Sequence, residues 1–329
     1  MFSVLDMFTI GVGPSSSHTV GPMVAAHAFA SSLLADHLVD RTARVKITLY
    51  GSLALTGLGH GTDRAAMAGL EGNLPATVDT DHMMRIRETC ALDDTLNLAG
   101  LKRIHFDYDR DVVFEQWKRM AAHPNGMRFQ AFDAAASLVD EQVWYSIGGG
   151  FVRKGAPEDP MIGIHECPPE GTSFADADES SSTDFGVEAP YPFSSCAELV
   201  SLCREHHLSI AELVWANETA SRSGIQVRSD IDAILRVMRA CVDHGCTSAE
   251  PTLPGGLDVP RRAPKMYRRL ASNSDVLRRD SRRKDAVLES SDAAWVDLFA
   301  LAVSEENAGG GRIVTAPTNG SAGIIPAVL

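Results

Sequence analysis

A loop near the start of this sequence concentrates glycine, serine, histidine and threonine within residues 11–22. A long run of regularly spaced apolar residues follows, so we expect the loop to lead into the N-terminus of a helix. Free N–H groups and the positive end of the helix dipole favour an anion there, such as a carboxylate or a phosphate. The polar side chains expected to bind this anion are Ser15, Ser16, Ser17, His18 and Thr19. The simpler alternative is that one serine only caps the helix.

A second glycine-rich loop, Gly59–Asp63, carries a histidine suited to proton transfer. Glycines on both sides of His60 leave its ring unobstructed, and an imidazole with an ordinary pKa of about 6.5 can act as general acid or base at neutral pH. We expect His60 and Asp63 to be catalytic, with the Asp63 carboxylate orienting the His60 ring. The alternative is a loop histidine that only hydrogen-bonds to Asp63.

A third loop, residues 309–323, is again rich in glycine and small polar side chains. Its spacing matches neither the phosphate-binding loop of nucleotide enzymes nor the dinucleotide fingerprint. The cysteines are scattered, at Cys90, Cys167, Cys196, Cys203, Cys241 and Cys246, and their spacings match no zinc finger or ribbon. We interpret them as structural thiols in a reducing compartment.

The elements that must position these loops follow from the periodicity of the apolar residues. We predict a helix after each of the first two loops, a strand between them, and then a third helix and three more strands. The helices are expected at 19–38, 62–70 and 82–90, and the strands at 44–50, 104–107, 127–132 and 143–147. Residues 51–61 are expected to form a loop throughout. Together these elements indicate an α/β domain over residues 1–153.

Residues 154–189 are rich in Pro, Asp, Glu, Ser and Gly, which is typical of an interdomain linker. A mostly helical domain is expected over residues 190–329. Its predicted helices are 196–206, 210–221, 231–244 and 292–307, with a polar loop at 273–283. Ser195 and Ser209 are suitable N-caps for the first two. The whole chain is therefore expected to be an α+β protein, with an α/β domain followed by a helical one.

The composition is that of a globular protein that can bury a substantial core, with 44% hydrophobic and 22% charged residues among 329. A formal net charge of −13 gives no electrostatic reason to bind nucleic acid or an anionic membrane. No apolar run has the length of a membrane span, and the N-terminus lacks the features of a signal peptide. We therefore expect a cytoplasmic protein that acts on a small molecule.

Several segments, taken together and in order, resemble the iron–sulfur-dependent L-serine dehydratases, also called L-serine ammonia-lyases. The resemblance covers the whole chain, and as a set its motifs are highly specific. They are Gly13–Thr19, Gly21–Pro22, Tyr50–Gly57, Gly59–Asp63, Asn125–Phe129, Tyr145–Phe151, Pro190–Phe193, Pro260–Ala263 and Glu305–Leu329.

The resemblance implies conversion of L-serine to pyruvate and ammonia. It implies an N-terminal domain similar to the allosteric substrate-binding domain of some phosphoglycerate dehydrogenases, followed by a helical catalytic domain. It also implies a [4Fe-4S] cluster held by cysteines, with an open iron that acts as a Lewis acid on the β-hydroxyl. The first loop would then hold the substrate carboxylate and His60 would transfer the proton. The other residues expected to line the substrate site are Thr62, Thr318, Asn319 and Gly320.

Two departures limit what the resemblance assigns. Members of the family continue beyond the position of Leu329, and that part carries most of the cluster cysteines. Some members also have a cysteine where this sequence has Ser321-Ala322. We therefore expect the chain to be truncated at its C-terminal end, with the cluster ligands beyond Leu329 and no metal ligand assigned within it.

Two other functions stay open. The first domain alone could be a binding module that senses serine or another small anion. The substrate could also be threonine, because one methyl group discriminates only weakly in an apolar pocket. Loops from two domains that meet at one site are compatible with association into a homodimer.

Overall fold

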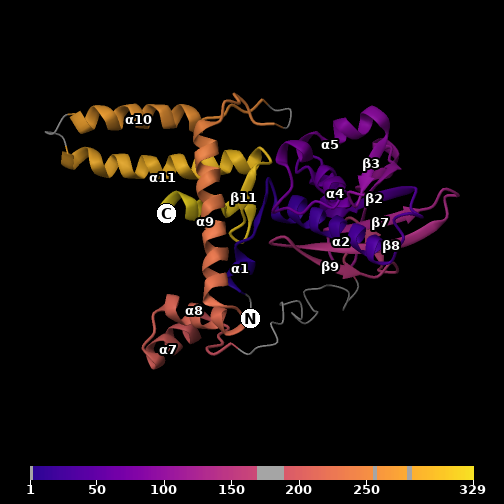
Figure 1. Ribbon diagram of the computed structural model, residues 1–329, viewed down its shortest axis with the longest axis horizontal. Helices are drawn as coiled ribbons and strands as arrows, with labels where there is room; N and C mark the ends of the chain where they lie inside the picture. The colour runs from indigo at the N-terminus through magenta and orange to yellow at the C-terminus, as the bar shows by residue number, and fades with distance from the viewer. Residues whose placement is uncertain (1–2, 169–188, 255–257, 280–283) are drawn as a thin grey trace.

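The computed structural model confirms the α+β class, with a sheet-rich region followed in the chain by a helical region (Figure 1). It describes residues 3–168, 189–254, 258–279 and 284–329.

A five-stranded sheet forms the centre of the first region, in the order β5-β2-β7-β8-β9. Strand β2 runs parallel to β5 and antiparallel to β7, and the remaining neighbours are antiparallel. Alternate residues of β2, Val45, Ile47 and Leu49, are fully buried, as the predicted alternation requires. The strands are β2 (Arg44–Tyr50), β5 (Val112–Glu115), β7 (Gly126–Phe132), β8 (Leu138–Gly148) and β9 (Phe151–Gly155).

Helix α2 (Gly21–Ala35) packs on this sheet, α4 (Thr62–Leu70) packs on α2, and α5 (Thr80–Asp93) packs on α4. The close approach of α2 and α4 depends on Gly69, because a Cβ there would lie 2.3 Å from the carbonyl oxygen of Met23. Phe29 of α2 stacks on Phe129 of β7, with 5.5 Å between the ring centroids. This packing fixes the point at which the second glycine-rich loop enters its helix.

The expectation that residues 51–61 form a loop throughout is wrong, because α3 (Gly51–Thr56) follows β2 directly. Leu53 and Ala54 are buried there, and a helical turn pairs backbone groups that a buried loop would leave unsatisfied. Gly51 makes the change of direction with a φ of 54°. His60 therefore lies on a short turn between α3 and α4.

Smaller elements complete the first region, and one of them lies beyond its expected boundary. They are β3 (Thr95–Leu98), β4 (Lys102–His105), α6 (Tyr108–Asp111), β6 (Lys118–Met120) and β10 (Met161–Gly163). Strand β3 pairs with β4, and β10 pairs with β6. Because β10 falls within the expected linker 154–189, the first region continues at least to Gly163. Residues 169–188 of that linker lie outside the described residues.

Long helices build the second region (Figure 1). Helices α7 and α8 span the predicted residues, and the side chains of Ser195 and Ser209 cap them. The predicted loop at 273–283 is wrong for residues 273–279, which continue α10. This stretch contains no glycine or proline and only extends a helix that has already formed. Residues 280–283 lie outside the described residues. The helices are α7 (Cys196–His206), α8 (Ile210–Ser221), α9 (Gly224–Thr247), α10 (Ala263–Arg279), α11 (Lys284–Ala308) and α12 (Ile324–Val328).

The N-terminal segment joins the two regions. Strand β1 (Ile10–Val12) pairs antiparallel with β11 (Arg312–Val314), and the Gly13 N–H donates to the carbonyl of Gly311 at 3.0 Å. Just before α1 (Val4–Met7), the Ser3 hydroxyl donates to Glu218 of α8 at 2.7 Å. Figure 1 shows α1 between the helices and the sheet. The first glycine-rich loop therefore lies where the two regions meet.

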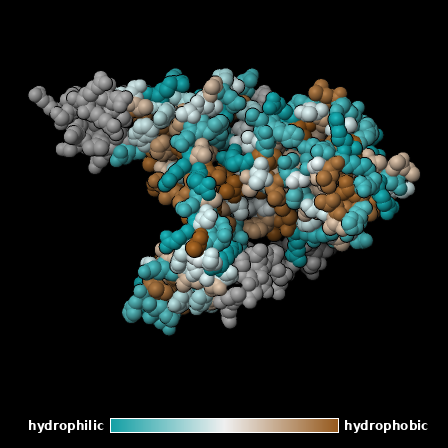
Figure 2. All heavy atoms as spheres, viewed as in Figure 1, coloured by the Kyte–Doolittle hydropathy of each residue, from teal (hydrophilic) through white to brown (hydrophobic). Residues whose placement is uncertain are grey.

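The surface is mainly hydrophilic at the outer parts of the molecule. Figure 2 shows hydrophobic residues gathered toward the middle of the view, where the helical region approaches the sheet region. In the part of the chain that the structure describes, no helix combines the length and the apolar composition that crossing a membrane requires.

Candidate functional site

The first glycine-rich loop forms a π-helical turn, Ser16–Val20, that runs directly into α2. Ser15 caps this turn, because its hydroxyl oxygen accepts a hydrogen bond from the His18 N–H at 3.2 Å. Ser16 is buried, and the Ser17 hydroxyl lies 2.8 Å from the His18 ring. Ser15 therefore has the capping role that the sequence left open, and Ser17 has an internal partner.

His18 is held between two serines. Its Nδ1 lies 2.8 Å from Ser17 Oγ, and its Nε2 lies 2.9 Å from Ser52 Oγ. A hydroxyl can donate to one ring nitrogen and accept from the other, so both contacts suit a neutral imidazole. Burial lowers the pKa of His18, and the neighbouring His60 lowers it further. The ring is therefore fixed in orientation and favoured in its neutral form.

The His60 ring lies beside His18, with 4.9 Å between the ring centroids. Its Nδ1 lies 2.9 Å from the carbonyl oxygen of Thr56. A carbonyl oxygen only accepts hydrogen bonds, so Nδ1 of the neutral ring carries the proton and Nε2 keeps its lone pair. The backbone of α3 thus sets the tautomer in which His60 can accept a proton at Nε2.

Two threonines brace these loops from within. Thr62 is fully buried and its hydroxyl donates to the carbonyl of His18 at 2.5 Å. Thr19 is 1% exposed and its hydroxyl donates to the carbonyl of His60 at 2.8 Å. Each threonine therefore links the backbone of one glycine-rich loop to the other.

Asp63 does not orient His60 in this structure. Its Oδ2 accepts a hydrogen bond from the Tyr108 hydroxyl at 2.6 Å, and burial together with this bond raises the pKa of Tyr108. Asp63 belongs to the first turn of α4 and is buried against α6, whereas His60 belongs to the preceding turn. The Thr56 carbonyl takes the orienting role that the sequence suggested for Asp63.

The third loop meets the first through a backbone contact. Asn319 is buried, and its Nδ2 donates to the carbonyl of Val12 at 3.0 Å. The Thr318 hydroxyl lies 2.9 Å from that of Ser321, and both Thr318 and Gly320 are exposed. Asn319 thus supports the strand that leads into the first loop, and neither Thr318 nor Gly320 lines the cavity described next.

A cavity of about 330 Å³ lies where the two regions meet. This volume falls within the range of small-molecule sites, which begins at about 300 Å³. Of the residues singled out from the sequence, Thr19, His60 and Asp63 line it. The other lining residues are Gly13, Pro14, Leu58, Gly59, Gly61, Arg64, Met83, Met84 and Arg87 from the sheet region, and Pro254, Ala308 and Gly310 from the helical region.

The charged residues that line this cavity differ in how far they are neutralised. Arg64 forms an ion pair with Glu88 at 3.1 Å, and Asp63 accepts the bond from Tyr108. The guanidinium carbon of Arg87 lies 4.3 Å from the centre of the Tyr108 ring. Among the described residues no carboxylate forms an ion pair with Arg87, and the Asp63 carboxylate has only a neutral hydroxyl as its hydrogen-bond partner.

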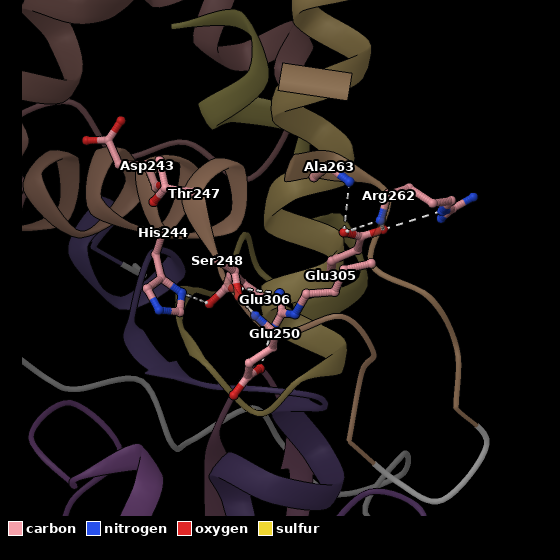
Figure 3. Close-up of polar contacts among 10 residues, drawn as sticks. Asp243, His244, Thr247, Ser248, Glu250, Arg262, Ala263, Glu305 and Glu306 are labelled. Carbon is pink, nitrogen blue, oxygen red and sulfur yellow. Dashed lines mark hydrogen bonds and ion pairs between the residues drawn. The ribbon is translucent and has the colours of Figure 1, made fainter. Parts of the chain in front are cut away.

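The helical region contains a buried ion-pair network close to the residues that it contributes to the cavity lining (Figure 3). Glu306, near the end of α11, accepts from Arg261 Nη1 at 2.6 Å and lies 2.5 Å from His244 Nδ1. Arg261 also reaches Glu250 at 3.1 Å. The side chains of Arg261 and Glu306 are each only 4% exposed, so this pair is a fixed part of the interior.

The residues on either side of Glu306 connect this network to the cavity. Glu305 accepts hydrogen bonds from the backbone N–H groups of Arg262 and Ala263 at 2.9 and 3.1 Å (Figure 3). Asn307 Nδ2 donates to the carbonyl of Pro14 at 3.0 Å. The end of α11 is therefore held from both sides, and this sets where Ala308 meets the first loop.

Sequence reasoning missed Ser52, Tyr108 and Arg87. Ser52 lies two residues after a predicted strand, within the motif Tyr50–Gly57, and this position is a signal that could have found it. Tyr108 and Arg87 lie outside all three glycine-rich loops, and only the packing of α5 and α6 brings them to Asp63.

The described residues do not fit an iron–sulfur cluster. Within them, no group of three or more His, Cys, Asp or Glu side chains is placed to hold a metal ion. Burial raises the pKa of Cys90 and Cys246 to about 11 and that of Cys241 to about 12. Since the thiolate is the metal ligand, such thiols are poor candidates.

Comparison with known protein families now gives the class of this protein. Residues 3–156 match the family model described as serine dehydratase beta chain, and residues 205–329 match the one described as serine dehydratase alpha chain. The chain belongs to the serine dehydratase family.

Individual curated relatives agree with this assignment. The chain is 44% identical over 327 residues to the L-serine dehydratase of Streptomyces coelicolor and 42% identical over 332 residues to L-serine dehydratase 2 of Escherichia coli. It is 37% identical over 333 residues to the L-serine dehydratase of Haemophilus influenzae. These matches cover 99–100% of this chain, and the chain spans 65–66% of the length of these relatives.

Proposed function

We propose that this chain is the part of an L-serine dehydratase that binds L-serine and removes its α-proton. The observation that carries the proposal is the state of His60. Its ring lines the cavity, its Nδ1 is engaged by the Thr56 carbonyl, and its Nε2 has a free lone pair. The choice of L-serine as the substrate rests on the relatives, which are named L-serine dehydratase.

In this proposal His60 acts as the general base. Nε2 takes the proton from the α-carbon, and the electron pair of the broken C–H bond forms the double bond between the α- and β-carbons. The C–O bond to the β-hydroxyl breaks, the oxygen leaves with the electron pair of that C–O bond, and a proton converts the departing hydroxide to water. The resulting aminoacrylate tautomerises to an imine, which water hydrolyses to pyruvate and ammonia. No described residue is assigned to the departure of the hydroxyl.

The serine-rich loop has a supporting role in this proposal. Ser15 caps the turn, Ser17 positions the His18 ring, and Thr19 holds the backbone of His60 while also lining the cavity. Because the neighbouring His18 ring is neutral, it does not repel the positive charge that His60 acquires when it takes up a proton. These contacts indicate that the hydroxyl groups of the loop mainly position His18 and His60, and that not every one of them binds the substrate directly.

The experiment uses protein expressed from its complete gene, purified without oxygen and supplied with iron and sulfide. Pyruvate formation from L-serine is measured together with the iron and sulfide content. We expect pyruvate from the parent protein and a fall in kcat of about 10²- to 10⁴-fold in His60→Ala, the usual contribution of a general base. The Kd for L-serine should change far less than kcat.

His105→Ala is the matched control, because His105 is an exposed histidine outside the cavity. Its turnover should equal that of the parent. Absence of pyruvate from the cluster-loaded parent would overturn the proposed function. Unchanged turnover in His60→Ala would remove His60 from the mechanism and leave the function to another base.

A further inference from the structure

We propose that Arg87 binds the carboxylate of the substrate, in a subsite completed by Tyr108 and Asp63. The inference rests on the proposed function, since it names the group that holds L-serine while His60 removes the proton. Its basis is a cation that lines the cavity and has no anionic partner among the described residues.

The chemistry of Arg87 suits a carboxylate. A guanidinium presents its N–H donors in a planar fork that matches the two oxygens of a carboxylate. Stacking on an aromatic ring uses the face of the guanidinium and leaves the edge with its donors free. The guanidinium carbon of Arg87 lies over the Tyr108 ring, 4.3 Å from its centre, a distance that suits such stacking.

The support of Arg87 is built into the fold. The Tyr108 hydroxyl donates to Asp63 at 2.6 Å, and Asp63 is 1% exposed at the start of α4. This bond fixes the ring on which Arg87 rests, so three helices, α4, α5 and α6, determine where the guanidinium lies. A cation held in this way loses little side-chain freedom when it binds an anion.

Several other polar groups near the cavity already have partners, although Asp63 Oδ1 is buried without one among the described residues. Arg64, the second arginine of the lining, is paired with Glu88. The Ser17 hydroxyl binds the His18 ring, and the Thr19 hydroxyl donates to the His60 carbonyl. Arg87 is therefore the positively charged lining residue without an ion-pair partner in the described part of the chain. An α-amino carboxylate is a class of ligand that also places an α-proton within reach of a base.

The test measures binding rather than turnover. Titration calorimetry is carried out with protein from the complete gene that carries His60→Ala, so that L-serine is not consumed. We expect Arg87→Gln to raise the Kd for L-serine at least about tenfold, because a charge-assisted bidentate pair is lost. Arg87→Lys should give a smaller increase, since it keeps the charge without the planar fork.

Arg85→Gln is the matched control. It removes the same charge from the same helix, and Arg85 does not line this cavity, so its Kd should stay within about twofold of the parent. L-serinamide, in which an uncharged amide replaces the carboxylate, is the second probe. Its affinity should be the same with and without Arg87→Gln. Thermal unfolding of each variant checks that the fold is intact.

Three results would overturn the assignment. They are an unchanged Kd for L-serine in Arg87→Gln, an equal loss of L-serinamide affinity, and no binding of L-serine by the parent. The first would return the carboxylate to the N–H groups of the first loop. Because binding is measured apart from pyruvate formation, the subsite can fail while turnover stands, and turnover can fail while the subsite stands.

Discussion

Two arginines near the cavity, one in each region of the molecule, use the same charge in opposite ways. Arg261 of the helical region is 4% exposed, contacts Glu306 and Glu250, and has its charge balanced inside the protein. Arg87 of the sheet region rests on an aromatic ring and has no acidic partner among the described residues. A guanidinium that is ion-paired inside the protein helps to hold the structure around the cavity. A guanidinium at the cavity without an ion-pair partner is available to bind a ligand.

The same division extends beyond these two residues. The sheet region contributes two groups that have no hydrogen-bond partner among the described residues, the His60 Nε2 lone pair and the N–H donors of Arg87. The helical region contributes Pro254, Ala308 and Gly310 to the lining, and its charged groups lie behind them. In the proposed function, the sheet region supplies the reacting and binding groups and the helical region supplies part of the cavity wall.

The largest effect expected on the stability side of this comparison comes from Arg261→Ala. Removing one partner of a buried ion pair leaves the other charge uncompensated, so we expect the free energy of unfolding to fall by about 3–5 kcal/mol. Urea denaturation measures it. Arg262→Ala is the matched control, because the Arg262 side chain is 70% exposed and its pairing with Glu305 should contribute about 0–1 kcal/mol. Equal losses in the two variants would contradict the assignment of Arg261 to the interior.

A smaller effect is expected where the first loop touches the end of α11. A Cβ at Gly13 would lie 1.8 Å from the carbonyl oxygen of Asn307, and backbone cannot move aside easily. We expect Gly13→Ala to lower the free energy of unfolding by about 3 kcal/mol, at the upper end of the usual cost of overpacking. Gly59→Ala is the control, because its nearest neighbour would be 3.6 Å away. A stable Gly13→Ala protein would show that the wall and the loop are not rigidly joined.

Tyr108→Phe sharpens the comparison on the side of Arg87. The ring that supports Arg87 remains, but the Asp63 carboxylate loses its hydrogen bond while staying buried. We expect a loss of about 1–2 kcal/mol in the free energy of unfolding, measured by urea denaturation. Tyr267→Phe serves as the control, since among the described contacts the Tyr267 ring packs edge-on against Trp295 and its hydroxyl has no hydrogen bond. Equal losses of unfolding free energy in Tyr108→Phe and Tyr267→Phe would show that the hydrogen bond from Tyr108 to Asp63 does not stabilise the fold.

The smallest effect concerns the pH dependence of stability. Burial lowers the pKa of His18 below its ordinary value of 6.5, so the folded protein takes up this proton less readily than the unfolded chain. The contribution to stability is present above about pH 6.5 and is lost as the pH falls through the folded pKa. His123, whose pKa burial also lowers, acts in the same direction.

Denaturation of the parent and of His18→Gln at several pH values between about 8 and 5 tests this sign. The parent should lose stability toward acid, and His18→Gln should lose less over the same range. The same slope in both proteins would mean that His18 is protonated in the fold without cost.

Local patterns predicted much of the fold. The strand at 44–50 and the helices at 62–70, 196–206 and 210–221 are confirmed with the predicted bounds, because alternation, helical period and capping serines act over a few residues. The prediction failed for residues 273–279, which extend the preceding helix α10 although they are polar. It failed again in the expected linker, where β10 pairs with β6. These two strands are about 40 residues apart in the sequence, so no local pattern predicts their pairing.

The sequence by itself determined the α+β class and the positions of the glycine-rich loops, since each depends on neighbouring residues. It also singled out His60 as a candidate base, and this stays a prediction. Only the tertiary structure decided which group each side chain meets. Asp63 binds Tyr108, 45 residues away, and the Thr56 carbonyl sets the tautomer of His60. Arg87 reaches the same cavity because α5 packs on α4. Contacts of this kind depend on how whole elements pack, and spacing along the chain carries no record of that.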